Sequence, residues 1–149
     1  MDGKIYLSNE AYEKLISHLV KFEENKDAII DEYFPYHTDE RREFSQLIIN
    51  YLQKIDSLVE KVEVSKELNQ EIPLVIIGCQ VTIRDLETKE EFQYTIGGPY
   101  VQSDSFDYIS YLSPVGREFL LKSVGDVVTV NTPGGQYSYE ILQIKLPEN

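Results

Sequence analysis

The stretch that decides the fold of the C-terminal half is SPVGREFLLKSVGDVVTVNTPGGQYSYEILQI, residues 113–144. It opens on a Ser-Pro corner and a short amphipathic segment, which predict a helix over about residues 115–122 with Ser113 as N-cap and Pro114 at its first position. Apolar and polar residues then alternate on both sides of a Thr-Pro-Gly-Gly turn, as in two half-buried antiparallel strands. Because Pro133 fixes φ and the following glycines permit positive φ, this turn reverses the chain.

Two further strands are predicted before this hairpin. The segment LVIIGCQVTIRDL covers residues 74–86, and EEFQYTIGG covers residues 90–98. Four strands within about 75 residues are enough for one small twisted sheet. We therefore expect a C-terminal domain, residues 74–149, that contains an antiparallel sheet and one short helix.

The first half of the chain has the pattern of two helices that pack against each other. Apolar residues of the second helix follow a 4-3-4-3-4 spacing, typical of a coiled-coil seam: Phe44, Ile48, Tyr51, Ile55, Leu58 and Val62. The first helix carries a related series: Tyr12, Leu15, Leu19, Phe22, Ile29 and Tyr33. Two antiparallel helices of about 25 residues, each about 37 Å long, are expected within residues 1–68.

Capping residues mark the expected ends of these helices. Ser8 is placed to cap the first helix, because its hydroxyl can accept a hydrogen bond from an unpaired N–H of the first turn. Pro35 stops that helix, and Thr38 or Asp39 is placed to cap the second. A polar run ended by a proline predicts a linker at residues 69–73. The fold class predicted is α+β, a helical hairpin followed by a small sheet domain.

Charge and composition exclude several classes of function. The net charge is −12 at pH 7 over 149 residues, which opposes autonomous binding to DNA because phosphate contacts need a basic surface. No apolar run approaches the roughly 20 residues that span a bilayer and no signal-peptide pattern occurs, so we expect a cytoplasmic protein without membrane association. Cys79 is the only cysteine and lies in an apolar run, so we expect it to be buried rather than reactive.

Three short segments that contain Pro or Gly occur in a fixed order in the C-terminal half: SPVG at 113–116, VGDVV at 124–128 and NTPGG at 131–135. In this order they resemble the C-terminal domain of the bacterial Gre transcript-cleavage factors. That domain has an FKBP-like fold and docks on RNA polymerase at the mouth of its secondary channel. The resemblance implies the same fold here, with RNA polymerase as partner. It also implies a polymerase-docking corner formed by Ser113, Pro114, Val115 and Gly116.

The helical hairpin is similar to the Gre coiled coil, which enters the secondary channel. Two acidic residues at the tip of that coiled coil help to hold a catalytic Mg²⁺ in the polymerase, so that backtracked RNA is hydrolysed. Carboxylates suit this task because Mg²⁺ is a hard cation that prefers oxygen ligands. Here the aligned tip reads YFPYHTDER over residues 33–41, and Phe34 and His37 stand in the places of the acidic pair.

The tip residues are Phe34, Pro35, Tyr36 and His37. Their aromatic side chains either contact a partner or close the end of the coiled coil by packing. Asp39 and Glu40 are the candidates for a relocated acidic pair, although acids are also common in the first turn of a helix because they interact favourably with its dipole. The resemblance implies no cofactor or metal of the chain's own, only a polymerase-held Mg²⁺ that tip acids would meet.

These observations favour a regulator of transcription elongation that binds RNA polymerase and inserts its hairpin into the secondary channel. Strong stimulation of RNA cleavage is not expected, since the aligned tip lacks the acidic pair. The chain is not expected to be an enzyme, because the polymerase supplies the substrate and the metal. The alternatives are a cleavage factor with a relocated acidic pair, an FKBP-like isomerase or chaperone, and a hairpin-mediated interaction protein outside transcription. A monomer is expected, since the hairpin buries its own seam.

Overall fold

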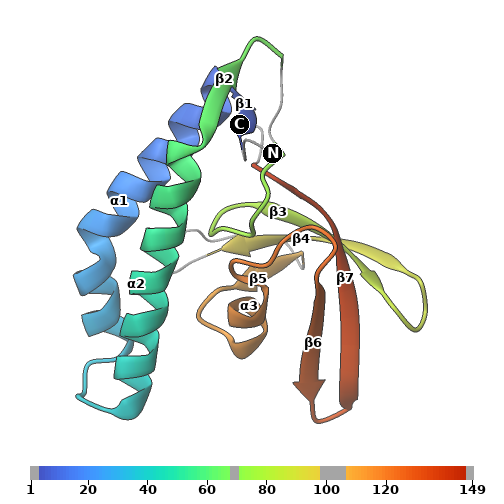
Figure 1. Cartoon of the computed structure of the whole chain (residues 1–149). Coiled ribbons are helices and arrows are strands. Elements are labelled where there is room, and N and C mark those ends of the chain that lie inside the picture. The colour runs from blue at the N-terminus through green and yellow to red at the C-terminus, as the bar shows by residue number, and fades with distance from the viewer. Residues whose placement is uncertain (1–3, 68–70, 98–106, 147–149) are drawn as a thin grey trace. The chain divides into compact units, whose positions relative to one another are not determined.

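The computed structural model describes residues 4–67, 71–97 and 107–146 (Figure 1). Contacts within the chain divide it into two units, Met1–Asn69 and Gln70–Asn149. Each unit has a set of fully buried apolar side chains, such as Leu15 in the first and Ile141 in the second. The α+β fold class is confirmed. Neither long helix of these described ranges is apolar enough to cross a membrane.

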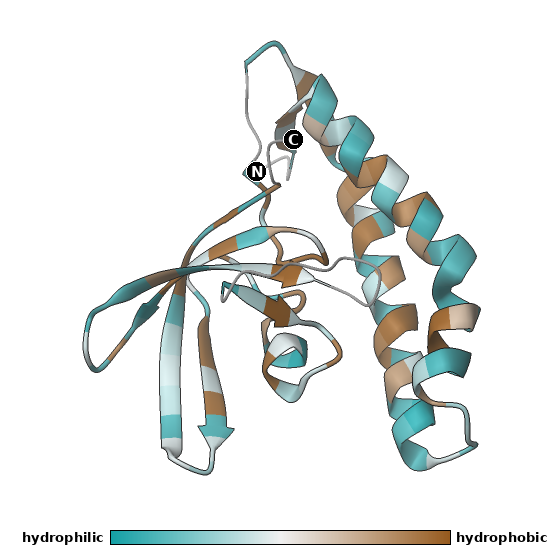
Figure 2. Ribbon diagram, turned by 180° about the vertical axis from the view of Figure 1, so that it is seen from behind, coloured by the Kyte–Doolittle hydropathy of each residue, from teal (hydrophilic) through white to brown (hydrophobic). Residues whose placement is uncertain are grey.

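The first unit is a helical hairpin with a short strand at each end of it. Its elements are β1 (Ile5–Ser8), α1 (Asn9–Tyr33), α2 (Asp39–Glu60) and β2 (Val62–Ser65). The two helices have 25 and 22 residues and lie side by side in both views (Figures 1 and 2). The predicted antiparallel hairpin is therefore confirmed, and its turn lies at the end opposite to β1 and β2.

The predicted seam of α2 is buried. Its members are each at most 5% exposed: Phe44, Ile48, Tyr51, Ile55 and Leu58. Val62, the expected sixth member, belongs instead to β2 and is only partly buried. Figure 2 shows hydrophobic residues recurring along both helices between hydrophilic ones. The buried residues of α1 differ in part from the predicted series: Ala11, Leu15, Phe22, Ile29 and Ile30.

Both helices begin at the capping residues that the sequence indicates. The hydroxyl of Ser8 accepts a hydrogen bond from the N–H of Ala11 at 3.2 Å. The hydroxyl of Thr38 accepts one from the N–H of Arg41, also at 3.2 Å. Of the two candidates for the second cap, Thr38 is therefore the cap, and Asp39 is the first helical residue. These bonds satisfy backbone donors that a helix leaves unpaired at its start.

A parallel pair of strands joins the two ends of the hairpin. β1 pairs with β2 from Ile5↔Val62 to Ser8↔Ser65. This pair was not predictable from the sequence, because each strand has only four residues and so carries too little alternation to recognise. The N–H of Ile5 also donates to the carbonyl of Lys61 at 2.8 Å.

The second unit is built on a sheet with strand order β5-β4-β3-β7-β6 among its described residues. Its elements are β3 (Gln80–Asp85), β4 (Glu91–Gly97), β5 (Tyr108–Ser110), α3 (Pro114–Phe119), β6 (Val127–Thr132) and β7 (Gly135–Lys145). The predicted hairpin of β6 and β7 is confirmed by their antiparallel register. The sheet is antiparallel except at its edge, where β5 runs parallel to β4.

The expectation of one strand over residues 74–86 is wrong for its first six residues. β3 begins only at Gln80, although Val75, Ile76 and Cys79 before it are buried. Gly78 has a φ of +98°, which interrupts an extended strand. Leu74 forms only an isolated antiparallel bridge with Ser123, so most of this apolar run reflects burial rather than strand pairing. Burial also raises the pKa of Cys79 to about 12, which agrees with the expectation of a buried, unreactive thiol.

Smaller differences concern element ends. The helix expected over residues 115–122 runs from Pro114 to Phe119, and it ends where Leu121 takes a positive φ of 68°. Gly98, the expected end of a strand, lies outside the described residues. So do residues 69 and 70 of the expected linker 69–73. Within that segment Glu71 bridges to Lys145 of β7.

Candidate functional site

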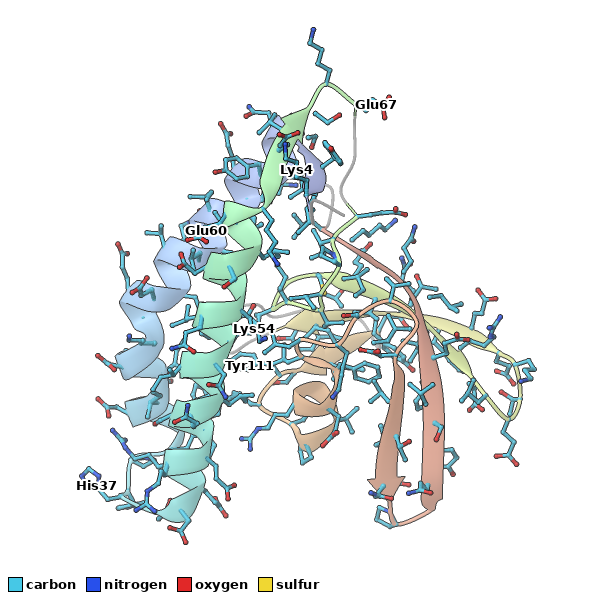
Figure 3. All side chains as sticks on the ribbon, in the orientation of Figure 1. Lys4, His37, Lys54, Glu60, Glu67 and Tyr111 are labelled. Carbon is cyan, nitrogen blue, oxygen red and sulfur yellow. The ribbon has the colours of Figure 1, made fainter. Side chains whose placement is uncertain are left out.

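The hairpin tip is the short turn between the end of α1 and the start of α2. Phe34 caps α1, and its N–H donates to the carbonyl of Ile30 at 2.8 Å. The N–H of Thr38 donates to the carbonyl of Tyr36 at 2.9 Å. Figure 3 shows the side chain of His37 at this end of the hairpin and Lys4 at the other. The turn is thus closed by backbone bonds on both of its sides.

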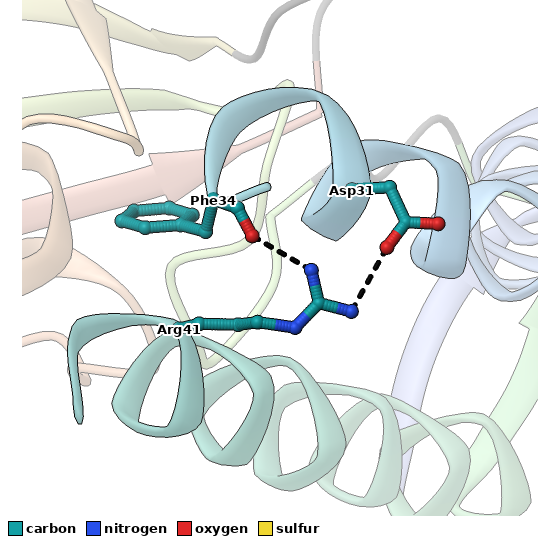
Figure 4. A network of polar contacts seen from close by, with 3 residues as sticks. All are labelled: Asp31, Phe34 and Arg41. Atoms are coloured by element: carbon teal, nitrogen blue, oxygen red, sulfur yellow. Dashed lines mark hydrogen bonds and ion pairs between the residues drawn. The ribbon is translucent and has the colours of Figure 1, made fainter. Parts of the chain in front are cut away.

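Arg41 joins the two helices at the tip. It lies in the first part of α2, and Figure 4 shows its guanidinium reaching the end of α1. Its Nη1 donates to the carbonyl of Phe34 at 2.7 Å, and its Nη2 contacts Oδ1 of Asp31 at 2.8 Å. The Arg41 side chain is 23% exposed, against 68% for Asp31. A planar guanidinium can hold two acceptors in a fixed geometry, and here both acceptors belong to the end of the other helix.

The aromatic residues of the tip divide into one that packs and one that is exposed. The ring of Phe34 stacks on that of Phe44, with centroids 4.7 Å apart and an interplanar angle of 29°. Phe44 itself is fully buried. Tyr36, in contrast, is 76% exposed, and Pro35 and His37 beside it are exposed as well. Phe34 therefore closes the coiled coil, while the apex presents the three residues that follow it.

Two of the acids close to the tip, Asp31 and Asp39, lie against an arginine. Asp31 contacts Arg41, and Oδ1 of Asp39 lies 3.5 Å from Nη1 of Arg42, with side chains 90% and 83% exposed. Glu40, the other candidate, is exposed in the first turn of α2. Across the part of the chain that the structure describes, no group of three or more His, Cys, Asp or Glu side chains is placed to hold a metal ion.

A polar pair in the seam is the feature that the sequence analysis missed. A hydrogen bond of 2.7 Å joins Nε2 of His18 in α1 to the hydroxyl of Tyr51 in α2. The ring of Phe22 contacts both partners, with centroids 5.6 Å and 5.4 Å away. Burial lowers the pKa of His18 to about 4, so the imidazole is neutral near pH 7. Its place three residues after Leu15 and four before Phe22 fits the heptad spacing, a signal hidden by counting apolar residues alone.

The hydroxyl of Ser113 forms its hydrogen bonds within the corner itself. The hydroxyl of Ser113 donates to the carbonyl of Ser110 at 2.7 Å and accepts from the N–H of Gly116 at 3.1 Å. The predicted N-cap is therefore confirmed, as is Pro114 at the first helical position. Gly116 is buried, and a Cβ there would overlap the carbonyl oxygen of Ser110.

Within this corner, Pro114 is the exposed residue and Val115 is partly buried. Ser113 and Gly116 fix the shape of the corner rather than extending from it. Any partner that docks here meets the ring of Pro114 first. These four residues therefore differ in exposure and in internal contacts, although the sequence places them together.

The comparisons with known proteins match both the second unit and the chain as a whole. The family model described as "Transcription elongation factor, GreA/GreB, C-term" matches residues 70–146, just over half of the chain. The chain is 32% identical over 158 positions to transcription elongation factor GreA of Thermosipho melanesiensis, covering 95% of this chain and 97% of the relative. It is 37% identical over 109 positions to GreA of Rickettsia bellii, covering 73% of this chain and 66% of the relative.

Among solved structures, the prokaryotic transcription elongation factor GreA/GreB from Nitrosomonas europaea aligns with a TM-score of 0.49 at 23% identity, over 95% of this chain and 99% of that one. The family model and the relative aligned along nearly the whole chain place this protein in a class whose named members are transcription elongation factors. The chain belongs to the GreA/GreB family.

Proposed function

We propose that the chain binds RNA polymerase through its second unit and places its hairpin tip in the secondary channel. There it occupies the channel without strong stimulation of RNA cleavage. Membership of a family of transcription elongation factors supports the choice of partner. The resemblance of the hairpin to the Gre coiled coil supports the route of entry.

The observation that carries this proposal is the chemistry of the tip. The apex consists of Pro35, Tyr36 and His37, none of which offers a carboxylate. Mg²⁺ prefers oxygen ligands, so an imidazole nitrogen is a poor replacement for a carboxylate. The carboxylate of Asp31 is already in contact with the Arg41 guanidinium. A tip of this kind can occupy a channel but offers few oxygen ligands to a metal ion.

The docking part of the proposal centres on Pro114. Its ring is exposed in a corner whose backbone is fixed by Ser113 and Gly116. A fixed, exposed proline is suited to a protein contact because little conformational freedom is lost when it binds.

Cleavage of backtracked RNA by purified polymerase tests this function. We expect the chain to add little cleavage, and to reduce the cleavage stimulated by an active Gre factor as its concentration rises. Binding to polymerase without any competition would contradict entry into the channel. Robust cleavage by the chain alone, lost on Asp39→Ala or Glu40→Ala but kept on Asp56→Ala, would instead identify a relocated acidic pair. Asp56 is the matched control because it is an exposed acid of α2 farther along the helix.

A gain of activity provides the converse test. Tyr36→Asp combined with His37→Glu places two carboxylates on the exposed apex and leaves Phe34 stacked on Phe44. We expect partial cleavage stimulation from this variant, because it adds the oxygen ligands that Mg²⁺ prefers. Tyr36→Asn with His37→Gln is the matched control of similar size without charge. Equal activity of the two variants would contradict the metal-ligand explanation.

A further inference from the structure

We propose that Arg41 is a positioning residue, which orders the turn at the tip and thereby presents Tyr36 and His37 as the surface that enters the polymerase. This inference rests on the function proposed above for the tip. The ordering of the turn by Arg41 is nevertheless a property of the isolated chain, and it can be measured without the polymerase.

The contacts of Arg41 span the turn in sequence and in space. One guanidinium nitrogen binds the carbonyl of Phe34 and another binds the carboxylate of Asp31. Both acceptors belong to the end of α1, whereas Arg41 belongs to α2 (Figure 4). The exposed residues of the apex lie between these anchor points. Since their own side chains are exposed, the order of the apex depends on the backbone bond from Thr38 to Tyr36 and on what holds the two ends of the turn.

The geometry requires an arginine rather than any cation. The two acceptors are approached by different nitrogens of one planar group, and hydrogen bonds to charged groups are stronger than neutral ones. A lysine ammonium is a single point of charge on a flexible stem and does not reproduce this fork. The Arg41 side chain is 23% exposed and its bond to the Phe34 carbonyl is part-buried, so solvent screens that bond less than it screens a surface pair. The contact with Asp31, which is 68% exposed, is more open to solvent.

Arg42 provides a natural comparison at the next position. Its side chain is 83% exposed, and its contact with Asp39 is 3.5 Å long and lies within the same helix. Arg42 therefore carries the same charge beside the tip but does not connect α1 to α2 through this contact. Any effect of the charge alone is shared by the two arginines, whereas an effect on the turn belongs to Arg41.

The same contact also affects the chemistry of the tip. Because Arg41 holds the carboxylate of Asp31, one of the acids nearest the apex is paired with a positive charge instead of facing solvent alone. Arg41 thus gives the tip its shape and at the same time makes it a poorer site for a metal ion.

Fluorescence anisotropy measures the order of the turn directly. The chain has no tryptophan, so Tyr36→Trp introduces a single indole fluorophore at the apex. In this background, we expect Arg41→Gln to lower the anisotropy of the introduced indole, Arg41→Lys to give an intermediate value, and Arg42→Gln to leave it unchanged. Far-UV circular dichroism of each variant reports whether the helices remain formed. Equal anisotropy in the Arg41→Gln and Arg42→Gln variants would overturn the proposal.

Competition with an active Gre factor on backtracked polymerase then tests the functional consequence, with the natural Tyr36 in place. We expect the half-inhibitory concentration to rise about tenfold in Arg41→Gln, which corresponds to about 1.4 kcal/mol, and to stay unchanged in Arg42→Gln. Loss of anisotropy together with unaltered competition would overturn the positioning role. If the natural chain itself does not compete, the proposed function fails, while the anisotropy series still decides whether Arg41 orders the turn.

Discussion

The hairpin tip and the Ser113 corner both carry an exposed proline close to the start of a capped helix: Pro35 precedes α2, and Pro114 is the first residue of α3. At the corner, the hydroxyl of Ser113 already forms hydrogen bonds with the Ser110 carbonyl and the Gly116 N–H, and Gly116 has no space for a side chain. At the tip, the apex residues face solvent. The contacts that support the turn come from residues flanking the apex: Arg41 and the stacked rings of Phe34 and Phe44. Residues at the corner are therefore constrained by stability, whereas those of the apex can vary with little effect on it.

The largest effect is expected from a substitution that disrupts the packing of α1 against α2, on which the tip depends. Ile55 is fully buried in the seam, so Ile55→Asp places a charge without a partner between the helices. We expect the free energy of unfolding to fall by about 4 kcal/mol, measured by urea denaturation followed at 222 nm. Gln53→Asp adds the same charge at an exposed position of α2 and is the control. An unchanged midpoint for Ile55→Asp would contradict the intramolecular seam.

Lowering the pH should reduce the free energy of unfolding because of the buried His18. Burial lowers the pKa of His18 from 6.5 to about 4, so between these values the unfolded chain takes up a proton that the folded chain does not. Stability from this group is complete above pH 6.5 and is lost as the pH falls towards 4. Between pH 7.5 and 4.5 we expect the natural chain to lose about 2.5 kcal/mol more than His18→Gln. Parallel pH profiles of unfolding would refute this assignment.

Substitutions at the corner should distinguish a structural residue, Ser113, from an exposed one, Pro114. Ser113→Ala removes the cap of α3 and should lower the free energy of unfolding by about 1 kcal/mol. Pro114→Ala removes only an exposed ring, and we expect it to weaken binding to polymerase with a smaller change in stability. Urea denaturation and a competition pull-down measure the two quantities. If Pro114→Ala binds as tightly as the natural chain, this corner is not the docking surface.

The apex should show the smallest effect on stability. Tyr36→Ala with His37→Ala changes only exposed side chains, so we expect a change below about 0.5 kcal/mol. Binding to polymerase through the second unit should persist, while competition with an active Gre factor should decrease. A large drop in thermal stability would mean that the apex supports the hairpin and that its difference from the corner is smaller than the structure indicates.

Elements with a strong local signal were predictable from the sequence. The seam residues of α2, the caps at Ser8 and Thr38, and the Pro-Gly-Gly hairpin all depend on residues close in the chain. The parallel partners β1 and β2 were not predictable, because their pairing joins residues such as Ile5 and Val62 across the whole hairpin.

At the candidate site, the sequence located the tip but not the way in which it is held. The separation of Phe34 from Tyr36 into packed and exposed aromatic residues depends on which side of the turn each faces. The fork of Arg41 depends on the three-dimensional meeting of two helix ends. His18 was not predictable for a different reason: it is a polar residue at a seam position, so the spacing of apolar residues does not reveal it.

The parallel pairing of β1 with β2 has a consequence for the synthesis of the chain. Two parallel strands cannot be joined by a tight turn and need a long crossover connection, and here that connection is the helical hairpin itself. β1 leaves the ribosome before either helix, yet its partner emerges only after both helices have been made. During synthesis the base of the hairpin therefore cannot close until both helices have been made. An elongating chain that stops before Val62 has both helices but lacks the strand with which β1 forms this pair.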